Sequence, residues 1–116
     1  EEGDLHVPDA EECHQSYLKR AEDSAASGLT EESLELFERA LALRPRTPMA
    51  LMRKAELYEG KGLLMASIGE METLVELEPV DLTAHRKLLS LYKAQGMIRE
   101  HNIEVRRFKA LKESRK

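Results

Sequence analysis

The segment LYEGKG at residues 57–62 reveals how the chain is organised, because a similar segment, LYKAQG, follows at residues 91–96. The closing glycines, Gly62 and Gly96, are 34 residues apart, and counting back 34 residues from Gly62 reaches Gly28. A fixed period in this range is typical of proteins built from tandem structural repeats. The glycine positions therefore predict three copies of one unit along the chain.

The apolar residues predict two helices in each copy. In the middle copy, Leu51, Ala55 and Tyr58 follow a helical spacing before Gly62, and a second apolar series with helical spacing follows that glycine. We interpret each glycine as a left-handed residue at the end of the first helix, a conformation that costs little only for glycine. Prolines with the same period end the second helix, because proline cannot continue one. No copy can bury its apolar faces alone, so the copies must stack.

These residues resemble the tetratricopeptide repeat, a helix–turn–helix unit of 34 residues. The matching positions are Tyr17, Ala21, Gly28, Ser33, Phe37, Ala40 and Pro45 in the first copy, and Leu51, Ala55, Tyr58, Gly62, Ser67, Met71 and Pro79 in the second. The resemblance implies an all-α fold in which three tandem repeats form a right-handed α-solenoid. The repeats would span about 14–47, 48–81 and 82–113.

The third copy departs from the family pattern. It keeps Tyr92 and Gly96, but its other signature positions hold His85, Leu89, His101, Phe108 and Glu113. Large residues at small positions forbid the ordinary close approach of helices, and the last helix is also the most polar. This copy therefore resembles the terminal cap that repeat arrays need for solubility.

The domain boundaries follow from the repeats. Residues 1–12 are acidic and have no apolar period, so we interpret them as a tail or linker. We expect a single domain over residues 13–113, followed by a short basic end at residues 114–116.

The composition limits the class of protein. Hydrophobic residues make up 41% of the 116 residues and charged residues 34%, which excludes a disordered chain and a membrane protein. Cys13 is the only cysteine, so no internal disulfide forms, and we expect an intracellular, cytoplasmic protein. The chain begins with Glu1 rather than Met, which indicates a fragment or a processed form.

Charge is distributed unevenly along the chain. Residues 1–40 carry 12 acids and 3 bases, a net charge of −9, whereas residues 81–116 carry 4 acids and 10 bases, a net charge of +6. One interpretation is a set of solvated helix faces. The other is a basic C-terminal end that attracts acidic partners.

The sequence contains no pattern typical of an enzyme or of a metal site. The four histidines lack the paired spacing of a zinc site, and Cys13 and Ser33 lack a recognisable base within reach, since the side chains of adjacent Cys13 and His14 diverge on a helix. The glycines fall one per unit at turns, so no phosphate-binding loop is predicted. We expect no catalytic residue, no metal and no cofactor.

The resemblance implies a protein–protein interaction module or adaptor, in which the first helices line a concave groove that receives a peptide. The predicted groove residues are Lys19, Glu22, Met52, Arg53, Glu56, Arg86, Lys87, Ser90 and Lys93. The groove becomes more basic toward the third copy, which favours an acidic or carboxylate-bearing peptide. The alternative is that these long side chains only solvate an exposed helix face.

Some co-chaperone members of the family clamp the C-terminal carboxylate of heat-shock chaperones with Lys, Asn and Arg side chains. The matching positions in this chain are Leu18, Glu22, Arg53, Thr83 and Lys87. Only Lys87 fits, and Glu22 would repel a carboxylate. We therefore expect no clamp of that kind.

Two other functions remain open at this point. The chain could self-associate or form a structural part of a larger helical-repeat protein, with exposed Phe108 and Leu111 on its last helix as the interface. The segment at residues 106–116 has six basic residues and could contact nucleic acid or an anionic membrane. The acidic remainder of the chain and the lack of an aromatic stacking platform argue against nucleic acid.

Overall fold

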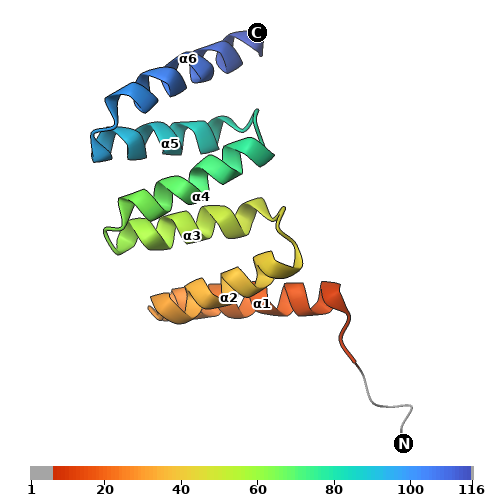
Figure 1. Ribbon diagram of the computed structural model, residues 1–116. Helices are drawn as coiled ribbons and strands as arrows, with labels where there is room; N and C mark the ends of the chain where they lie inside the picture. The colour runs from red at the N-terminus through yellow and green to blue at the C-terminus, as the bar shows by residue number, and fades with distance from the viewer. Residues whose placement is uncertain (1–6, 116) are drawn as a thin grey trace, which may run out of the picture. The chain divides into compact units, whose positions relative to one another are not determined.

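The computed structural model describes residues 7–115, and over that range the protein is built from helices without any strand (Figure 1). The described helices are α1 (Ala10–Ala26), α2 (Thr30–Leu43), α3 (Pro48–Gly60), α4 (Leu64–Leu77), α5 (Leu82–Gln95) and α6 (Ile98–Ser114). The all-α class and the two helices per repeat are thus confirmed. The chain divides into two compact units between Ala50 and Leu51, and each unit is described by itself.

In the first unit, α1 begins earlier than the sequence suggested. Asp9 is its N-cap: the Asp9 side chain accepts a hydrogen bond from the Glu12 N–H at 2.8 Å, and the Asp9 N–H donates to Glu12 Oε1 at 3.0 Å. This reciprocal pair satisfies two backbone donors at the start of the helix. Residues 10–12 are therefore helical rather than part of the tail expected over residues 1–12, while residues 1–6 lie outside the described residues.

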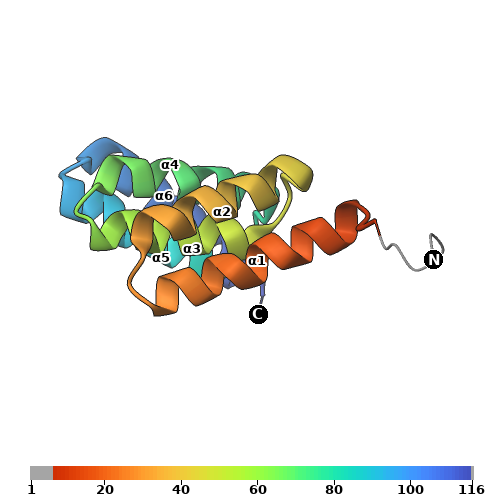
Figure 2. The same cartoon turned by 90° about the horizontal axis from the view of Figure 1, so that it is seen from below.

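The first unit is a helical hairpin in which α1 lies beside α2 (Figure 2). Small residues allow this close contact: Ala21 of α1 and Ala40 of α2 have no exposed surface, and neither does Phe37 between them in sequence. Ser33 of α2 is also fully buried, and its hydroxyl donates to the Ala21 carbonyl at 2.7 Å. The small positions of the repeat therefore serve both close packing and a hydrogen bond between the two helices.

The second unit repeats this arrangement with α3 and α4. The Ser67 hydroxyl donates to the Ala55 carbonyl at 2.8 Å, and both residues are fully buried. Lys54 of α3 adds a largely buried ion pair with Glu70 of α4, with 3.1 Å between Nζ and Oε2. In the third copy, His101 stands at the position of Ser67 and is half-buried. The third hairpin therefore lacks the serine-to-carbonyl hydrogen bond, and other contacts join α5 to α6, among them His85 with Glu104.

The three predicted turn glycines have the conformation that the sequence required. Gly28, Gly62 and Gly96 have φ angles of 79°, 79° and 76°, and within residues 7–115 no residue of another type has a positive φ. A Cβ atom at any of these glycines would meet nothing within 4 Å. The requirement for glycine is therefore conformational rather than steric crowding by neighbours.

The helix ends follow the predicted role of proline. α2 and α4 each have 14 residues and end just before Pro45 and Pro79. α6 has 17 residues and continues through Glu113, which takes the proline position in the third copy. Beyond it, an Arg115 Nη2 donates to the Val80 carbonyl at 2.5 Å. Without the proline, the last helix extends until it reaches the α4–α5 turn.

The core of the second unit is aliphatic. Its most deeply buried side chains include Ile68, Met71 and Leu74 of α4 and Leu88 and Leu91 of α5. Within residues 7–115, no helix combines the length and the apolar character needed to cross a lipid bilayer. The extent of one domain over residues 13–113 stays a prediction.

Candidate functional site

The predicted groove residues fall in both units. Lys19 and Glu22 belong to α1 in the first unit, where Lys19 is exposed, with its Nζ 3.5 Å from Asp23 Oδ2, and Glu22 is half-buried. The other seven belong to α3 and α5 in the second unit. These seven residues lie in the same compact unit.

The side chains on α3 and α5 form ion pairs across one face. Arg53 Nη1 lies 3.0 Å from Glu56 Oε1 one turn along α3, and Lys87 Nζ of α5 lies 2.5 Å from Glu59 Oε1 of α3. The Lys87–Glu59 pair joins the two helices, and the peptide-binding role of the predicted groove residues stays a prediction. We call this surface the α3–α5 face; its residues are Met52, Arg53, Glu56, Glu59, Lys87, Ser90 and Lys93.

Glu59 is a functional candidate that the sequence analysis missed. It lies three residues after Glu56 on the same side of α3, so helical spacing alone could have identified it. Its contact with Lys87 means that part of the expected basic charge is already neutralised by the protein itself. Lys93 and Ser90 are exposed, and Met52 is half-buried.

Arg86 contacts α6. Its guanidinium lies 5.7 Å from the centre of the Phe108 ring of α6, and Lys112 approaches the same ring at 5.4 Å. Both contacts are within the range of attraction between a cation and an aromatic face. Phe108 and Leu111 are half-buried rather than exposed as the sequence suggested. Self-association through these two residues stays a prediction.

The positions that would form a carboxylate clamp are occupied in other ways. Leu18 is buried in the first unit. In the second unit, Asp81 is the N-cap of α5 and its Oδ1 accepts a hydrogen bond from the Thr83 N–H, while Lys87 and Arg53 each contact a carboxylate of this chain. The absence of a carboxylate clamp stays a prediction.

Tyr92 connects α5 to α4 through its hydroxyl. The phenol donates to Glu72 Oε2 at 2.6 Å, and its side chain is buried. The pKa of Tyr92 is raised well above its ordinary value, mainly because the phenol is buried. The hydrogen bond to the Glu72 carboxylate raises this pKa further. The tyrosine that the repeat pattern predicted therefore serves as a neutral hydrogen-bond donor.

A buried polar pair connects α5 to α6. His85 and Glu104 are 5% and 1% exposed, and His85 Nδ1 contacts Glu104 Oε2. His85 Nε2 donates to the Pro79 carbonyl at 2.7 Å. The sequence analysis identified His85 as a departure from the repeat pattern, but it gave no signal that Glu104 was its partner.

A second buried histidine lies in the first unit. His14 Nε2 lies 3.0 Å from Thr47 Oγ1, whose hydroxyl donates to the Arg44 carbonyl. The histidine must therefore donate through Nε2, and its Nδ1 atom is buried without a hydrogen-bond partner. Among residues 7–115, no group of three or more His, Cys, Asp or Glu residues is arranged to hold a metal ion.

Comparison with known proteins identifies the fold. No protein-family profile and no curated protein sequence matches the chain. Solved structures match, however, and one of them is a crystal structure of MamA, with a TM-score of 0.78 and 16% identity over 88% of this chain and 60% of that one. This chain therefore spans less than two thirds of the length of that protein.

Two further structures carry the repeat in their descriptions. The first TPR of Spaghetti (RPAP3), bound to the HSP90 peptide SRMEEVD, matches with a TM-score of 0.73 and 15% identity over 92% of this chain and 83% of that one. The Sgt2 TPR domain from Aspergillus fumigatus matches with a TM-score of 0.70 and 14% identity over 85% and 66%. The chain has the fold of a tetratricopeptide-repeat domain. At these identities the likeness establishes the tetratricopeptide-repeat fold alone.

Proposed function

We propose that this tetratricopeptide-repeat chain is a non-catalytic protein–protein interaction module that binds an acidic peptide segment of a partner on the α3–α5 face. The observation that carries the proposal is the Lys87–Glu59 pair, because a lysine of that face already binds a carboxylate of this chain. The RPAP3 structure, in which a repeat of the same fold is bound to the acidic peptide SRMEEVD, supports the class of ligand.

Binding would proceed by exchange of one carboxylate for another. Lys87 is partly exposed, so a partner's carboxylate can replace Glu59 beside its ammonium group. The charged side chains of the face are Arg53, Lys87, Lys93, Glu56 and Glu59, three bases against two acids, for a net charge of +1. A small excess of positive charge predicts modest affinity, and the two fixed carboxylates restrict where a ligand's acidic groups can lie.

The test uses fluorescently labelled SRMEEVD as the probe and measures its affinity by anisotropy titration. Changing both Arg53 and Lys87 to Glu should weaken binding by about tenfold or more, since charge-assisted contacts are lost and repulsion is added. The matched control is Arg106→Glu, which reverses an exposed cation on α6 and should change affinity by less than about twofold. If the control variant loses binding and the double variant does not, the site is not on the α3–α5 face.

Two further measurements separate this site from a carboxylate clamp. Amidation of the C-terminus of SRMEEVD should change affinity by less than about threefold, because Arg53 and Lys87, two of the positions that match a carboxylate clamp, already contact carboxylates of this chain. Glu59→Gln should tighten binding by about threefold to tenfold, because it removes the carboxylate that competes for Lys87. Strong dependence on the free terminus, or weaker binding after Glu59→Gln, would contradict the exchange mechanism.

A further inference from the structure

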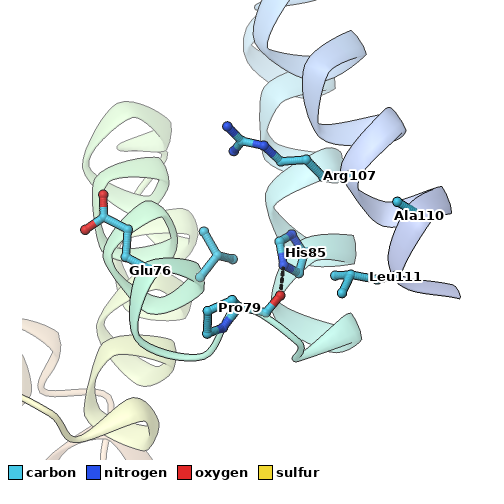
Figure 3. A pocket seen from close by; sticks show the side chains of 7 residues that line it. Glu76, Pro79, His85, Arg107, Ala110 and Leu111 are labelled. Carbon is cyan, nitrogen blue, oxygen red and sulfur yellow. Dashed lines mark hydrogen bonds between the residues drawn. The ribbon is translucent and has the colours of Figure 1, made fainter. Parts of the chain in front are cut away.

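A pocket of about 440 Å³ lies in the second unit, away from the residues of the α3–α5 face (Figure 3). It is lined by the last turn of α4, the α4–α5 turn, the first turn of α5 and the C-terminal half of α6. The lining residues are Val75, Glu76, Pro79, His85, Arg107, Ala110 and Leu111. Four of these seven side chains are apolar, so the cavity favours an apolar group.

Both ring nitrogens of His85, the polar side chain beside the α4–α5 turn, already have partners within the chain. One of its ring nitrogens donates to the Pro79 carbonyl and the other contacts Glu104 (Figure 3 shows the first of these bonds). The imidazole therefore has no nitrogen left for a ligand. A ligand inside the pocket must gain its affinity from apolar contact rather than from hydrogen bonds to His85.

The pocket carries opposite charges on two of its walls. Glu76 extends from α4 and Arg107 from α6, and both are exposed (Figure 3). Within residues 7–115, Glu76 has no ion-pair partner, and Arg107 makes one long contact of 3.6 Å to Glu104 Oε1. An acid on one wall and a base on the other, separated by apolar surface, match a ligand that presents a base and an acid on either side of an apolar group.

The secondary structure of the pocket walls favours a helical ligand over an extended peptide. Most of the lining comes from helices, and none of it is a strand edge to which an extended peptide could add. A helical ligand satisfies its own backbone hydrogen bonds, and residues four positions apart lie on one face of it. A helix can therefore place a base, an apolar residue and an acid in a row toward this pocket.

We propose that this pocket docks an amphipathic helix of a partner protein. The helix inserts one aliphatic side chain between α4 and α6, places a basic residue near Glu76, and places an acidic residue near Arg107. This site is independent of the α3–α5 face. The chain would then hold two segments at once, an acidic peptide on one face and a helix of mixed charge in the pocket.

The test uses three alanine-based helical peptides, each with capped ends and a single Leu. The Leu is flanked four residues away on each side by Lys and Glu, by Glu and Glu, or by Lys and Lys. Anisotropy titration should show that the mixed peptide binds more tightly than either single-sign peptide by about fivefold or more. Equal affinity of all three peptides would overturn the proposal.

Protein variants then locate the binding and exchange its specificity. Glu76→Lys should shift the preference to the peptide with two Glu residues, and Arg107→Glu should shift it to the peptide with two Lys residues, each by about tenfold. The double exchange should restore preference for the mixed peptide. These are gains of binding, which an unfolded variant cannot produce.

The apolar part of the site is tested separately. Ala110 is exposed on α6, so Ala110→Trp should fill the pocket without disturbing the core and should abolish binding of the mixed peptide. Arg106→Glu is the matched control, because Arg106 is exposed on α6 and does not line the pocket. If Ala110→Trp binds normally, or if Lys87→Glu is the change that removes binding, the helix does not dock in this pocket.

Discussion

Removing one member of the buried His85–Glu104 pair should destabilise the protein far more than removing both. Glu104 is 1% exposed and His85 is 5% exposed, so neither side chain can recover its lost contact from water. Besides His85, the Glu104 carboxylate contacts Arg107, with 3.6 Å between Oε1 and Nη1. When one member of the pair is removed, the buried side chain that remains therefore has few other contacts to replace the lost hydrogen bond.

The magnitudes differ between the two single changes. His85→Leu leaves a carboxylate buried without its main partner, and breaking a buried pair in this way costs about 3–5 kcal/mol. Glu104→Leu leaves a buried ring nitrogen without a partner, which costs about 1–3 kcal/mol. The double change to Leu should lie within about 1 kcal/mol of the wild type, because an apolar replacement of a buried pair is often neutral or stabilising.

The repeat itself supports the apolar replacement. Leu51 stands 34 residues before His85, at the same position of the second copy, and is 4% exposed. A leucine is thus accepted at this place in the second repeat. The same register places Glu70 where Glu104 stands, and Glu70 has Lys54 as its partner. In both copies a carboxylate on the second helix is held by a basic or imidazole group.

Urea unfolding followed by circular dichroism measures the four free energies of this cycle. With a urea slope of about 1.5 kcal/mol per molar, His85→Leu should lower the midpoint by about 2–3 M. The coupling between the two changes should exceed about 2 kcal/mol. His101→Leu, at a half-buried histidine of α6, is the control and should shift the midpoint little. Additive effects of the two single changes would refute the reasoning.

Three further predictions concern packing, backbone conformation and titration. Ala55→Leu should lower stability by about 1–3 kcal/mol in urea unfolding, because Ala55 has no exposed surface, whereas Ala94→Leu at an exposed position of α5 should be nearly neutral. Gly62→Ala should destabilise by about 1 kcal/mol because φ is positive, whereas Gly69→Ala inside α4 should stabilise by about 0.5–1 kcal/mol, and thermal melts compare the pair. The raised pKa of Tyr92 favours folding while the phenol is neutral, so the wild type should lose stability above about pH 10 more steeply than Tyr92→Phe.

The sequence was sufficient for features that depend on local rules. A left-handed turn requires glycine, and close contact between helices requires small residues, so Gly28 and Ser33 could be placed from their spacing alone. The end of α2 before Pro45 follows in the same way. The start of α1 was misplaced because its signal is a capping pair, Asp9 with Glu12, rather than an apolar period.

The candidate site was less predictable because long side chains choose among several partners. Spacing placed Lys87 on the first helix of its repeat, but it did not show that Glu59 binds it. Arg86 was expected in the groove, yet its guanidinium lies over the Phe108 ring, since an arginine can reach more than one neighbouring helix. Sequence patterns fix the face on which a residue lies better than the atom that it contacts.

The serine-to-carbonyl hydrogen bonds of the first two hairpins have a consequence for how the chain folds. Each bond joins residues 12 positions apart, Ser33 to Ala21 and Ser67 to Ala55. Short loops of this kind close within about 0.1 μs, and chains dominated by such local contacts fold rapidly. A ribosome adds about 5–20 residues per second. Each of these hairpins can therefore close as soon as its own two helices have been synthesised, long before the next one exists.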